Sequence, residues 1–236
     1  GSALGLSFGL SDLLVLDFGG QRILYALSRS EGALVEIAIA ADGSLAFSDS
    51  LSLGGTFAVG SNPALDGFVD SAGNTALAIA GLPQTPGQTV SLAPDGSLVA
   101  QAPLAAAGVM AAPAGIDLGA ERALVSGIPG AGGLDLLVDN GAGFAYVASL
   151  SDAPDRYLAD VSASAAFDFS GTHYLVTASA TEDGLNLVEV TPSALMQRDS
   201  LGAAEGLPIN TPTGVTVVQR LNETLIVVGS HESSSL

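Results

Sequence analysis

The sequence predicts an all-β fold, a β-propeller built of four-stranded antiparallel blades of about 51 residues each. The first observation is a turn that recurs five times after a short apolar run. The turns begin at Asp17, Asp70, Asp117, Asp168 and Gln219, at steps of 53, 47, 51 and 51 residues. The second observation is that the runs are short, rich in Val, Ile, Leu and Ala, and bounded by Gly, Pro, Asp and Asn, which is typical of strands.

Each repeat divides into four expected strands. The first strand covers residues 13–17, 67–70, 114–117, 165–168 and 215–219, and the second covers 23–28, 75–80, 123–127, 174–179 and 224–229. The third covers residues 34–40, 88–93, 134–138 and 185–190, and the fourth covers 45–51, 98–104, 144–150 and 195–201. None of these runs has the length and the i, i+3, i+4 spacing of an amphipathic helix. The best helical alternative lies over residues 157–166.

The recurring acidic and glycine residues have a structural explanation as turn residues. An Asp at the first turn position accepts hydrogen bonds from the turn's own amides, and a Gly tolerates the positive φ of tight hairpins. The residues so interpreted are Asp17, Gly20, Asp70, Gly73, Asp117, Asp168 and Gly171 between the first two strands, and Asp42, Gly43, Asp95 and Gly96 between the last two. The alternative is a ring of carboxylates that binds a metal ion.

The repeat count indicates one propeller region over residues 1–236. Its units are residues 13–64, 65–113, 114–163 and 164–214, followed by a partial fifth unit over 215–236. We expect the chain to be a fragment of a longer protein, because half a blade leaves an open edge. Alternatively, residues 4–8 supply the outermost strand of the last blade and close a small ring. An open edge also predicts self-association.

The composition and charge of the chain restrict the kinds of partner that it can bind. The chain carries 24 acidic residues against six basic ones, all Arg, and a formal net charge of −18. This charge repels phosphate backbones, which argues against nucleic acid, and it suits calcium, a possible cofactor. Residues 96–116 carry no charge, but they contain Pro and Gly and are cut by the repeat, so no membrane span is expected. The chain has no Cys, which excludes disulfides and thiolate chemistry within it.

Candidate binding residues lie on the loops that enter the first strand of each unit. In an up-and-down blade these longer, variable loops share one face with the loops between the second and third strands, and binding concentrates on such loops. The candidates are Asn62, Asp66, Asp160 and Asn210. Asn62 and Asn210 also have a simpler explanation, Asn62 as the start of a turn and Asn210 as the cap of a Pro-containing loop. No zinc-binding His spacing and no Gly-x-Ser-x-Gly motif occurs in the sequence, so no catalytic residue is assigned.

The repeating order of apolar run, Asp-x-x-Gly turn, apolar runs and Asp42-Gly43-Ser44-Leu45 resembles β-propellers of the lactonase and YVTN-repeat kind. It is also similar to propeller-like regions of large exported bacterial proteins with haemolysin-type calcium-binding segments. The resemblance covers nearly the whole chain and implies an extracellular or periplasmic, multidomain parent. No motif of the lactonase catalytic residues and no calcium-binding nonapeptide is present to carry those functions over.

Three functions are compatible with these observations. The first is a non-catalytic binding or scaffolding module of a larger exported bacterial protein. The second is a metal-dependent hydrolase or lyase of the lactonase-like propeller type, with its site on the propeller axis. The third is a structural spacer. The sequence favours the first, because no catalytic motif accompanies the repeat.

Overall fold

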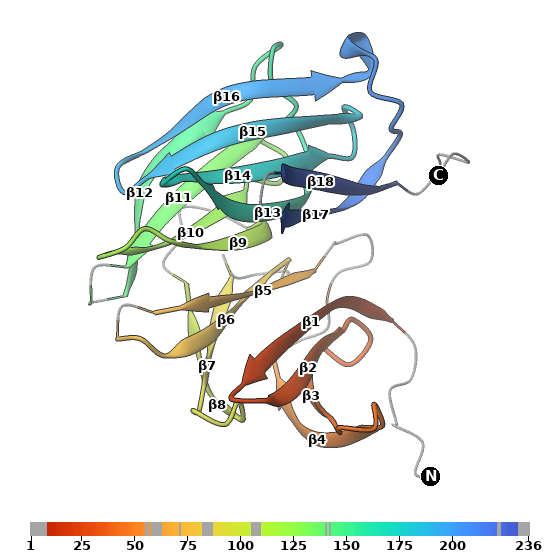
Figure 1. Cartoon of the computed structure of the whole chain (residues 1–236), viewed down its shortest axis with the longest axis vertical. Helices are drawn as coiled ribbons and strands as arrows, with labels where there is room; N and C mark the ends of the chain where they lie inside the picture. Colours follow the sequence, from red (N-terminus) through yellow and green to blue (C-terminus); the bar gives the residue numbers. More distant parts are fainter. Residues whose placement is uncertain are drawn as a thin grey trace.

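The computed structural model describes residues 9–54, 57, 63–70, 72–81, 87–104, 110–139, 141, 143–220 and 223–230. It forms four four-stranded antiparallel sheets and one two-stranded sheet (Figure 1). Its one helical element in the described residues is a short 3-10 helix, η1 (Ala203–Glu205). The prediction of an all-β propeller of four-stranded blades is therefore confirmed at the level of the fold.

Each sheet is an uninterrupted stretch of sequence in which consecutive strands pair. The first contains β1 (Leu10–Phe18), β2 (Gln21–Ser28), β3 (Ala33–Ile39) and β4 (Leu45–Ser52), and the second β5 (Ala64–Val69), β6 (Thr75–Ala80), β7 (Gln88–Leu92) and β8 (Leu98–Pro103). The third contains β9 (Ala111–Asp117), β10 (Arg122–Gly127), β11 (Gly133–Asp139) and β12 (Phe144–Ser151). The fourth contains β13 (Val161–Phe169), β14 (Thr172–Ser179), β15 (Gly184–Thr191) and β16 (Ala194–Gly202), and the last β17 (Pro212–Arg220) and β18 (Glu223–Ser230).

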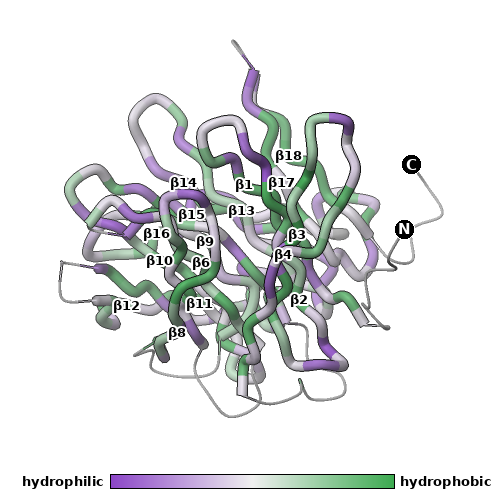
Figure 2. The backbone as a smooth tube through the Cα atoms, turned by 90° about the horizontal axis from the view of Figure 1, so that it is seen from below, coloured by the Kyte–Doolittle hydropathy of each residue, from purple (hydrophilic) through white to green (hydrophobic). Residues whose placement is uncertain are grey.

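The sheets are arranged around a common axis with their first strands innermost (Figure 1). β1 contacts β5, β5 contacts β9, β9 contacts β13, and β13 contacts β17. The core lies between neighbouring sheets, where the second and third strands of each sheet are the most deeply buried. Hydrophilic residues gather at the hairpin turns, and hydrophobic residues run along the strands (Figure 2). Among the described residues no helix is long and apolar enough to span a membrane.

Three apolar clusters join successive sheets. Leu27 of the first sheet packs with Leu77 of the second in one cluster. Ala78 of the second sheet and Leu124 of the third share another. The largest cluster joins the third and fourth sheets. Because each sheet buries its faces against its neighbours, the alternating apolar pattern of one repeat is satisfied only by the next repeat.

The turn residues form the local contacts that the sequence suggests. The Asp17 carboxylate accepts a hydrogen bond from the Gly20 amide at 2.7 Å. Asp70 accepts from the amides of Ala72 at 2.9 Å and Asn74 at 2.8 Å. In the turns between the third and fourth strands, Asp42 accepts from the Ser44 amide at 2.9 Å. Gly20, Gly73, Gly171, Gly43 and Gly96 all have positive φ.

Two of the turn aspartates make an additional contact with a basic side chain. Asp117 accepts from the Gly119 amide at 2.8 Å and from the Arg122 guanidinium at 2.6 Å. The Asp168 carboxylate lies 2.6 Å from Nδ1 of His173. Asp95 accepts from the Ser97 amide and hydroxyl. These hydrogen bonds tie each aspartate to its own hairpin.

The inner strands are longer at their beginnings than the sequence predicts. Residues expected in the entering loops form the first residues of β5, β9, β13 and β17. The helical alternative over residues 157–166 is wrong, because β13 begins at Val161 and pairs with β14. The sequence does not predict strand at these residues, because Ala, Ser, Gly and Pro are weak strand signals and the pairing between strands leaves no local pattern. Residues 4–8, proposed to close the ring, lie outside the described residues.

Candidate functional site

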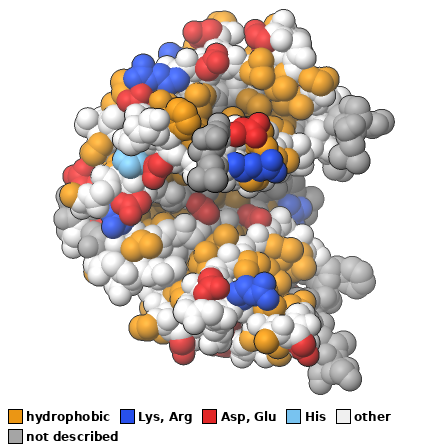
Figure 3. Space-filling view, viewed as in Figure 1, with side chains coloured by type: hydrophobic (Ala, Val, Ile, Leu, Met, Phe, Trp, Pro, Cys, Tyr) orange, Lys and Arg blue, Asp and Glu red, His pale blue; other side chains and the backbone are white. Residues whose placement is uncertain are grey.

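The inner strands surround an axial cavity of about 530 Å³. It is bordered by residues of β1, β5, β9, β13 and β17, so all five sheets contribute to it. The space-filling view shows the molecule hollowed at this place, with acidic side chains in the hollow (Figure 3). Cavities of this size accommodate small organic ligands. The axial cavity is therefore the candidate site.

Three of the hydroxyl residues that border the axial cavity are each the extra residue of a β-bulge in an inner strand. Ser11 is unpaired between Leu10 and Asp12 in β1. Ser162 occupies the same place in β13, and Thr213 occupies it in β17. A bulge bends the strand and re-aims a side chain. The Ser11 hydroxyl lies 3.4 Å from the Leu27 carbonyl oxygen, and the Ser162 hydroxyl lies 3.2 Å from the Ala178 carbonyl oxygen, so the arrangement repeats.

Sequence reasoning missed this set of hydroxyls, although a signal exists. Ser11, Ser162 and Thr213 each stand six residues before the first residue of the following turn, at positions 17, 168 and 219. The second and third repeats have Ala64 and Ala111 there. Ser162 and Thr213 lie in stretches expected to be entering loops, and Ser11 precedes the first expected strand, so the recurrence falls outside the expected strands.

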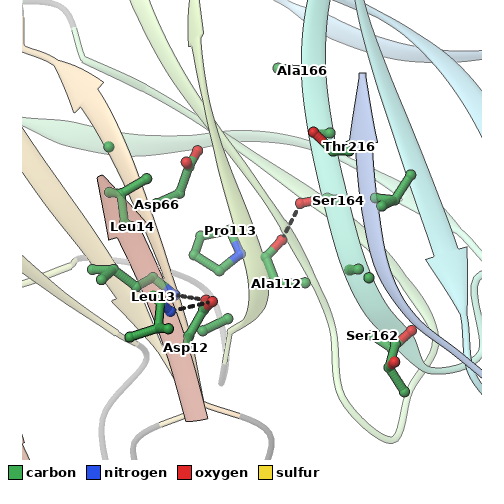
Figure 4. A pocket seen from close by; sticks show the side chains of 18 of the residues that line it. Asp12, Leu13, Leu14, Asp66, Ala112, Pro113, Ser162, Ser164, Ala166 and Thr216 are labelled. Atoms are coloured by element: carbon green, nitrogen blue, oxygen red, sulfur yellow. Dashed lines mark hydrogen bonds between the residues drawn. The ribbon is translucent and has the colours of Figure 1, made fainter. Parts of the chain in front are cut away.

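Two carboxylates border the cavity, Asp12 on β1 and Asp66 on β5 (Figure 4). Asp12 accepts hydrogen bonds from its neighbour Leu13 and from Leu65 on β5, both at 2.8 Å. Asp66 on β5 accepts from the Gly115 amide on β9 at 2.7 Å. Each carboxylate thus joins its own inner strand to the next strand around the axis.

Burial raises the pKa of Asp66 from 3.8 to about 6, and the charge of Asp12 adds to this effect. The amides of Gly115 and Gly67 oppose the shift by donating to the carboxylate. The pKa of Asp12 is also raised, chiefly by burial. Both side chains keep some solvent exposure because they border the cavity. Asp66 therefore changes its charge close to neutral pH, where a ligand or a reacting group can be affected by it.

Two further polar links join the inner strands at the axial cavity. Ser164 of β13 donates to the Ala112 carbonyl of β9 at 2.6 Å (Figure 4). Ser162 donates to the Pro212 carbonyl at the start of β17. Ala112 has a φ of 43°, a left-handed conformation that costs an alanine energy. The strained residue thus lies in the cavity wall.

The candidate residues from the sequence have different positions. Asp66 borders the cavity, inside β5 rather than on the loop before it. Asp160 directly precedes β13, and its carbonyl accepts from the Ala180 amide at 3.1 Å. Asn210 precedes β17, and its side chain accepts from the Thr211 hydroxyl at 3.2 Å. Neither Asp160 nor Asn210 is among the described residues that border the cavity. Asn62 lies outside the described residues.

The donor set does not fit a calcium ion. Calcium takes about six to eight oxygen ligands. Within the described part of the chain, no group of three or more His, Asp or Glu residues is placed to hold a metal ion. The two axial carboxylates already accept hydrogen bonds from the amides of Leu13, Leu65 and Gly115. The arrangement is that of hydrogen-bonded acids rather than of a cation cage.

Comparison with solved structures supports the fold. A protein of the 6-phosphogluconolactonase type from Bacteroides fragilis is 15% identical, with a TM-score of 0.61 over 92% of this chain and 62% of that chain. The GH43 β-xylosidase/α-arabinofuranosidase CoXyl43 from a compost metagenome is 10% identical, with a TM-score of 0.58 over 94% and 85%. The Aleuria aurantia lectin is 13% identical, with a TM-score of 0.55 over 92% and 68%.

These likenesses show a common fold and no common activity, because all the identities are low. The chain spans 61 to 63% of the length of several of the structures that it matches. No protein-family model matches the chain, and no curated protein matches it.

Proposed function

We propose that this chain is a non-catalytic binding module of a larger exported bacterial protein, and that a small ligand rich in hydrogen-bond donors occupies the axial cavity. The observation that carries the proposal is the cavity of about 530 Å³, to which the inner strands of all five sheets contribute. A rigid scaffold that converges polar groups on one concavity is the usual form of a ligand site.

The chemistry of the lining indicates the kind of ligand. Asp12 and Asp66 are acceptors when ionised, and the hydroxyls of Ser11, Ser162 and Thr213 donate or accept. No Arg or His is among the described lining residues. The formal net charge of −18 adds a field that attracts cations and repels anions. A polyol, a sugar or a small amine matches these groups better than a phosphate or a carboxylate does.

A fold-level analogy supports a sugar as one of these ligands. The Aleuria aurantia lectin, which shares the fold, was solved in complex with α-methyl-L-fucoside. The analogy concerns the fold alone, so it assigns no residue of this chain to sugar binding.

Calorimetry with a defined set of probes tests the binding function. The set comprises methyl glycosides of common hexoses and pentoses, glycerol, and putrescine as a small diamine. We expect at least one probe to bind the unaltered chain and to lose affinity about tenfold or more in Asp66→Asn. Asp199→Asn, an exposed change on the outer strand β16, is the matched control and should bind normally. Binding that survives Asp66→Asn unchanged places the ligand elsewhere.

A hydrolase or lyase is the second candidate, because two carboxylates approach the axis and one has its pKa raised to about 6. A carboxylic acid that titrates near neutral pH can donate a proton to a leaving group, and paired carboxylates of this kind hydrolyse glycosidic bonds. The test is turnover of nitrophenyl glycosides and of a δ-lactone. Turnover by the unaltered chain that Asp66→Asn abolishes and Asp199→Asn leaves intact supports the enzyme, and a chain that binds a probe without turnover supports the module.

A structural spacer is the third candidate. If no probe binds and no substrate turns over, the spacer function becomes the better description.

Export to the periplasm or the medium is part of the proposal and follows from the resemblance to exported bacterial propeller regions. Fractionation of the native cells, with an antibody to this chain, tests the location.

A further inference from the structure

Two hydroxyl groups of the axial cavity already donate their protons to backbone carbonyls. Ser164 donates to the Ala112 carbonyl at 2.6 Å (Figure 4), and Ser162 donates to the Pro212 carbonyl. A hydroxyl carries one proton and two acceptor lone pairs, so toward a ligand these two residues act as acceptors of hydrogen bonds. The side-chain donors that remain among the described lining residues are the hydroxyls of Ser11, Thr213 and Thr216.

Several backbone amides at the cavity are committed in the same way. The two axial carboxylates accept hydrogen bonds from the amides of Leu13, Leu65 and Gly115. Pro113, which also borders the cavity, has no amide proton. These four lining residues therefore offer a ligand no backbone N–H group.

The carboxylates themselves keep the capacity to accept further hydrogen bonds. An ionised carboxylate has about four lone-pair sites. Asp12 uses two of them, for the amides of Leu13 and Leu65. Asp66 accepts from the amides of Gly115 and Gly67. Each carboxylate thus retains about two acceptor sites.

No described lining residue balances the negative charge of these two carboxylates. Asp12 and Asp66 are the only ionisable residues among the described residues of β1, β5, β9, β13 and β17 that border the cavity. The charge of Asp12 adds to the raised pKa of Asp66, so the two carboxylates act on one another. Charges withdrawn from water are normally paired, and a cationic ligand supplies such a pairing.

We propose that the axial cavity binds a small primary amine as its ammonium ion, with the ammonium group on the side of Asp12 and Asp66. This inference rests on the proposed binding function and selects one of its three classes of ligand. An ammonium group has three donors and no acceptor, so it matches a lining that is rich in acceptors and poor in donors. Each hydroxyl of a sugar or polyol brings an acceptor oxygen together with its proton, and that oxygen finds few donors here.

The carbon skeleton of such an amine also has a complementary surface. Pro113, Ala163 and Val215 border the same cavity and present apolar atoms to it. Strand β13, which carries Ala163, lies across the cavity from Asp12 and Asp66 (Figure 4). A cation with a short alkyl chain therefore meets negative charge at one end and apolar groups at the other, and an inorganic cation lacks the second contact.

Calorimetry at pH 7 with three probes of one carbon skeleton tests the inference. Butylamine carries a charge and N–H donors, butyltrimethylammonium carries the charge without donors, and butanol is neutral. We expect butylamine to bind about tenfold or more tightly than either of the others. Asp66→Asn should weaken the binding of butylamine about tenfold or more, and Asp199→Asn on the outer strand β16 should leave it unchanged. The amide oxygen of Asn can still accept from Gly115, so the variant keeps this link between β5 and β9.

The outcomes separate this inference from the binding function on which it rests. If butanol or a methyl glycoside binds as tightly as butylamine and depends on Asp66, the cavity remains a ligand site and the ammonium is wrong. Equal affinity for butyltrimethylammonium means that charge alone is recognised, and this overturns the inference from hydrogen bonding. If no probe binds, or if Asp66→Asn changes the affinity for none of them, both proposals fail.

The pH dependence of binding provides a second test. Butylamine stays protonated from pH 5 to pH 7, as a lysine side chain does. Asp66, with a pKa of about 6, gains its charge over the same interval. We expect the affinity for butylamine to rise about three- to tenfold between these pH values, and much less in Asp66→Asn, where Asp12 alone still titrates in the cavity. An affinity that is the same at both pH values contradicts the inference.

Discussion

The Asp66 carboxylate accepts a hydrogen bond from the Gly115 amide at 2.7 Å, although the two residues are 49 positions apart. The bond joins β5 to β9 beside the axial cavity. The bond favours the ionised form of Asp66, yet burial still raises the pKa of the carboxyl group to about 6. The same residue therefore links two sheets and carries an ionisation that depends on its place in the fold.

Asp66→Asn should alter the dependence of stability on pH. Because the pKa is higher in the folded chain than the ordinary 3.8, folding favours the protonated acid, and stability falls as the pH rises from about 4 to above 6. The shift corresponds to about 1 to 3 kcal/mol after allowance for the partial exposure of Asp66. We expect the Asn variant to gain stability relative to the unaltered chain over this interval.

Urea unfolding at pH 4 and pH 7 measures this difference. Other acids with raised pKa values, such as Asp12 and Glu36, act in both proteins, so the comparison between the two chains isolates Asp66. A difference in unfolding free energy that is the same at both pH values contradicts the prediction.

Gly96→Ala and Gly43→Ala should separate backbone strain from steric overlap. Each glycine occupies the second position of an Asp-Gly-Ser-Leu turn, in successive repeats. The φ value is +88° at Gly96 and +81° at Gly43. A Cβ on Gly43 meets no atom within 4 Å, whereas one on Gly96 would lie 2.5 Å from Cδ1 of Ile23 and 2.6 Å from the Phe18 ring. We expect Gly43→Ala to cost about 1 to 2 kcal/mol from the backbone. Gly96→Ala should cost about 1 to 3 kcal/mol more. If thermal or urea unfolding gives the same loss of unfolding free energy for both variants, the side chains of Ile23 and Phe18 move to make room for the added methyl group at Gly96.

Gly184→Ala should destabilise the junction between the third and fourth sheets. A Cβ there would lie 2.1 Å from Cγ of Tyr157, whose backbone is held by Asn186 through bonds of 3.2 and 2.7 Å. We expect a loss of about 1 to 3 kcal/mol in unfolding free energy. Gly214→Ala in β17 is the control, because no atom lies within 4 Å of the added group. In a Tyr157→Ala background the penalty at Gly184 should largely disappear, and a persistent penalty would assign it to the strand backbone instead.

Ser162→Ala should loosen the β17–β18 hairpin more than the rest of the molecule. Its hydroxyl donates to the Pro212 carbonyl at the start of β17 and lies 3.2 Å from the Ala178 carbonyl oxygen within its own sheet. Loss of such a hydrogen bond costs about 0.5 to 1.5 kcal/mol. Hydrogen exchange of the amides of residues 215–218 should accelerate, while amides of β6 and β10 should be unaffected. Uniform acceleration throughout the chain would instead indicate a global loss of stability.

Much of the fold could be predicted because the relevant interactions are local. An Asp that accepts from its own turn, as Asp17 does from Gly20, leaves a pattern of neighbouring residues that repeats in every blade. The same holds for the alternation of apolar residues along strands. These signals located the hairpins and the period, and the period indicated a propeller.

The bulges and the beginnings of the inner strands could not be predicted in the same way. Ser11 borders the axial cavity only because β1 pairs with β2 one residue out of step at that point. Pairing registers depend on contacts between whole strands, so a bulge has no reliable signature in a single strand. For the same reason the sequence predicts loops at Ser162 and Thr213, where the structure has strands.

The sequence alone determines the tandem repetition of one strand-rich unit, the residues that form its turns and the excess of negative charge. The repeats and turns depend on residues that are neighbours in the chain, and the charge depends on composition alone. The axial cavity and the raised pKa of Asp66 arise where separate copies meet. Burial and strand pairing are properties of that assembly, because they depend on atoms brought together from several repeats.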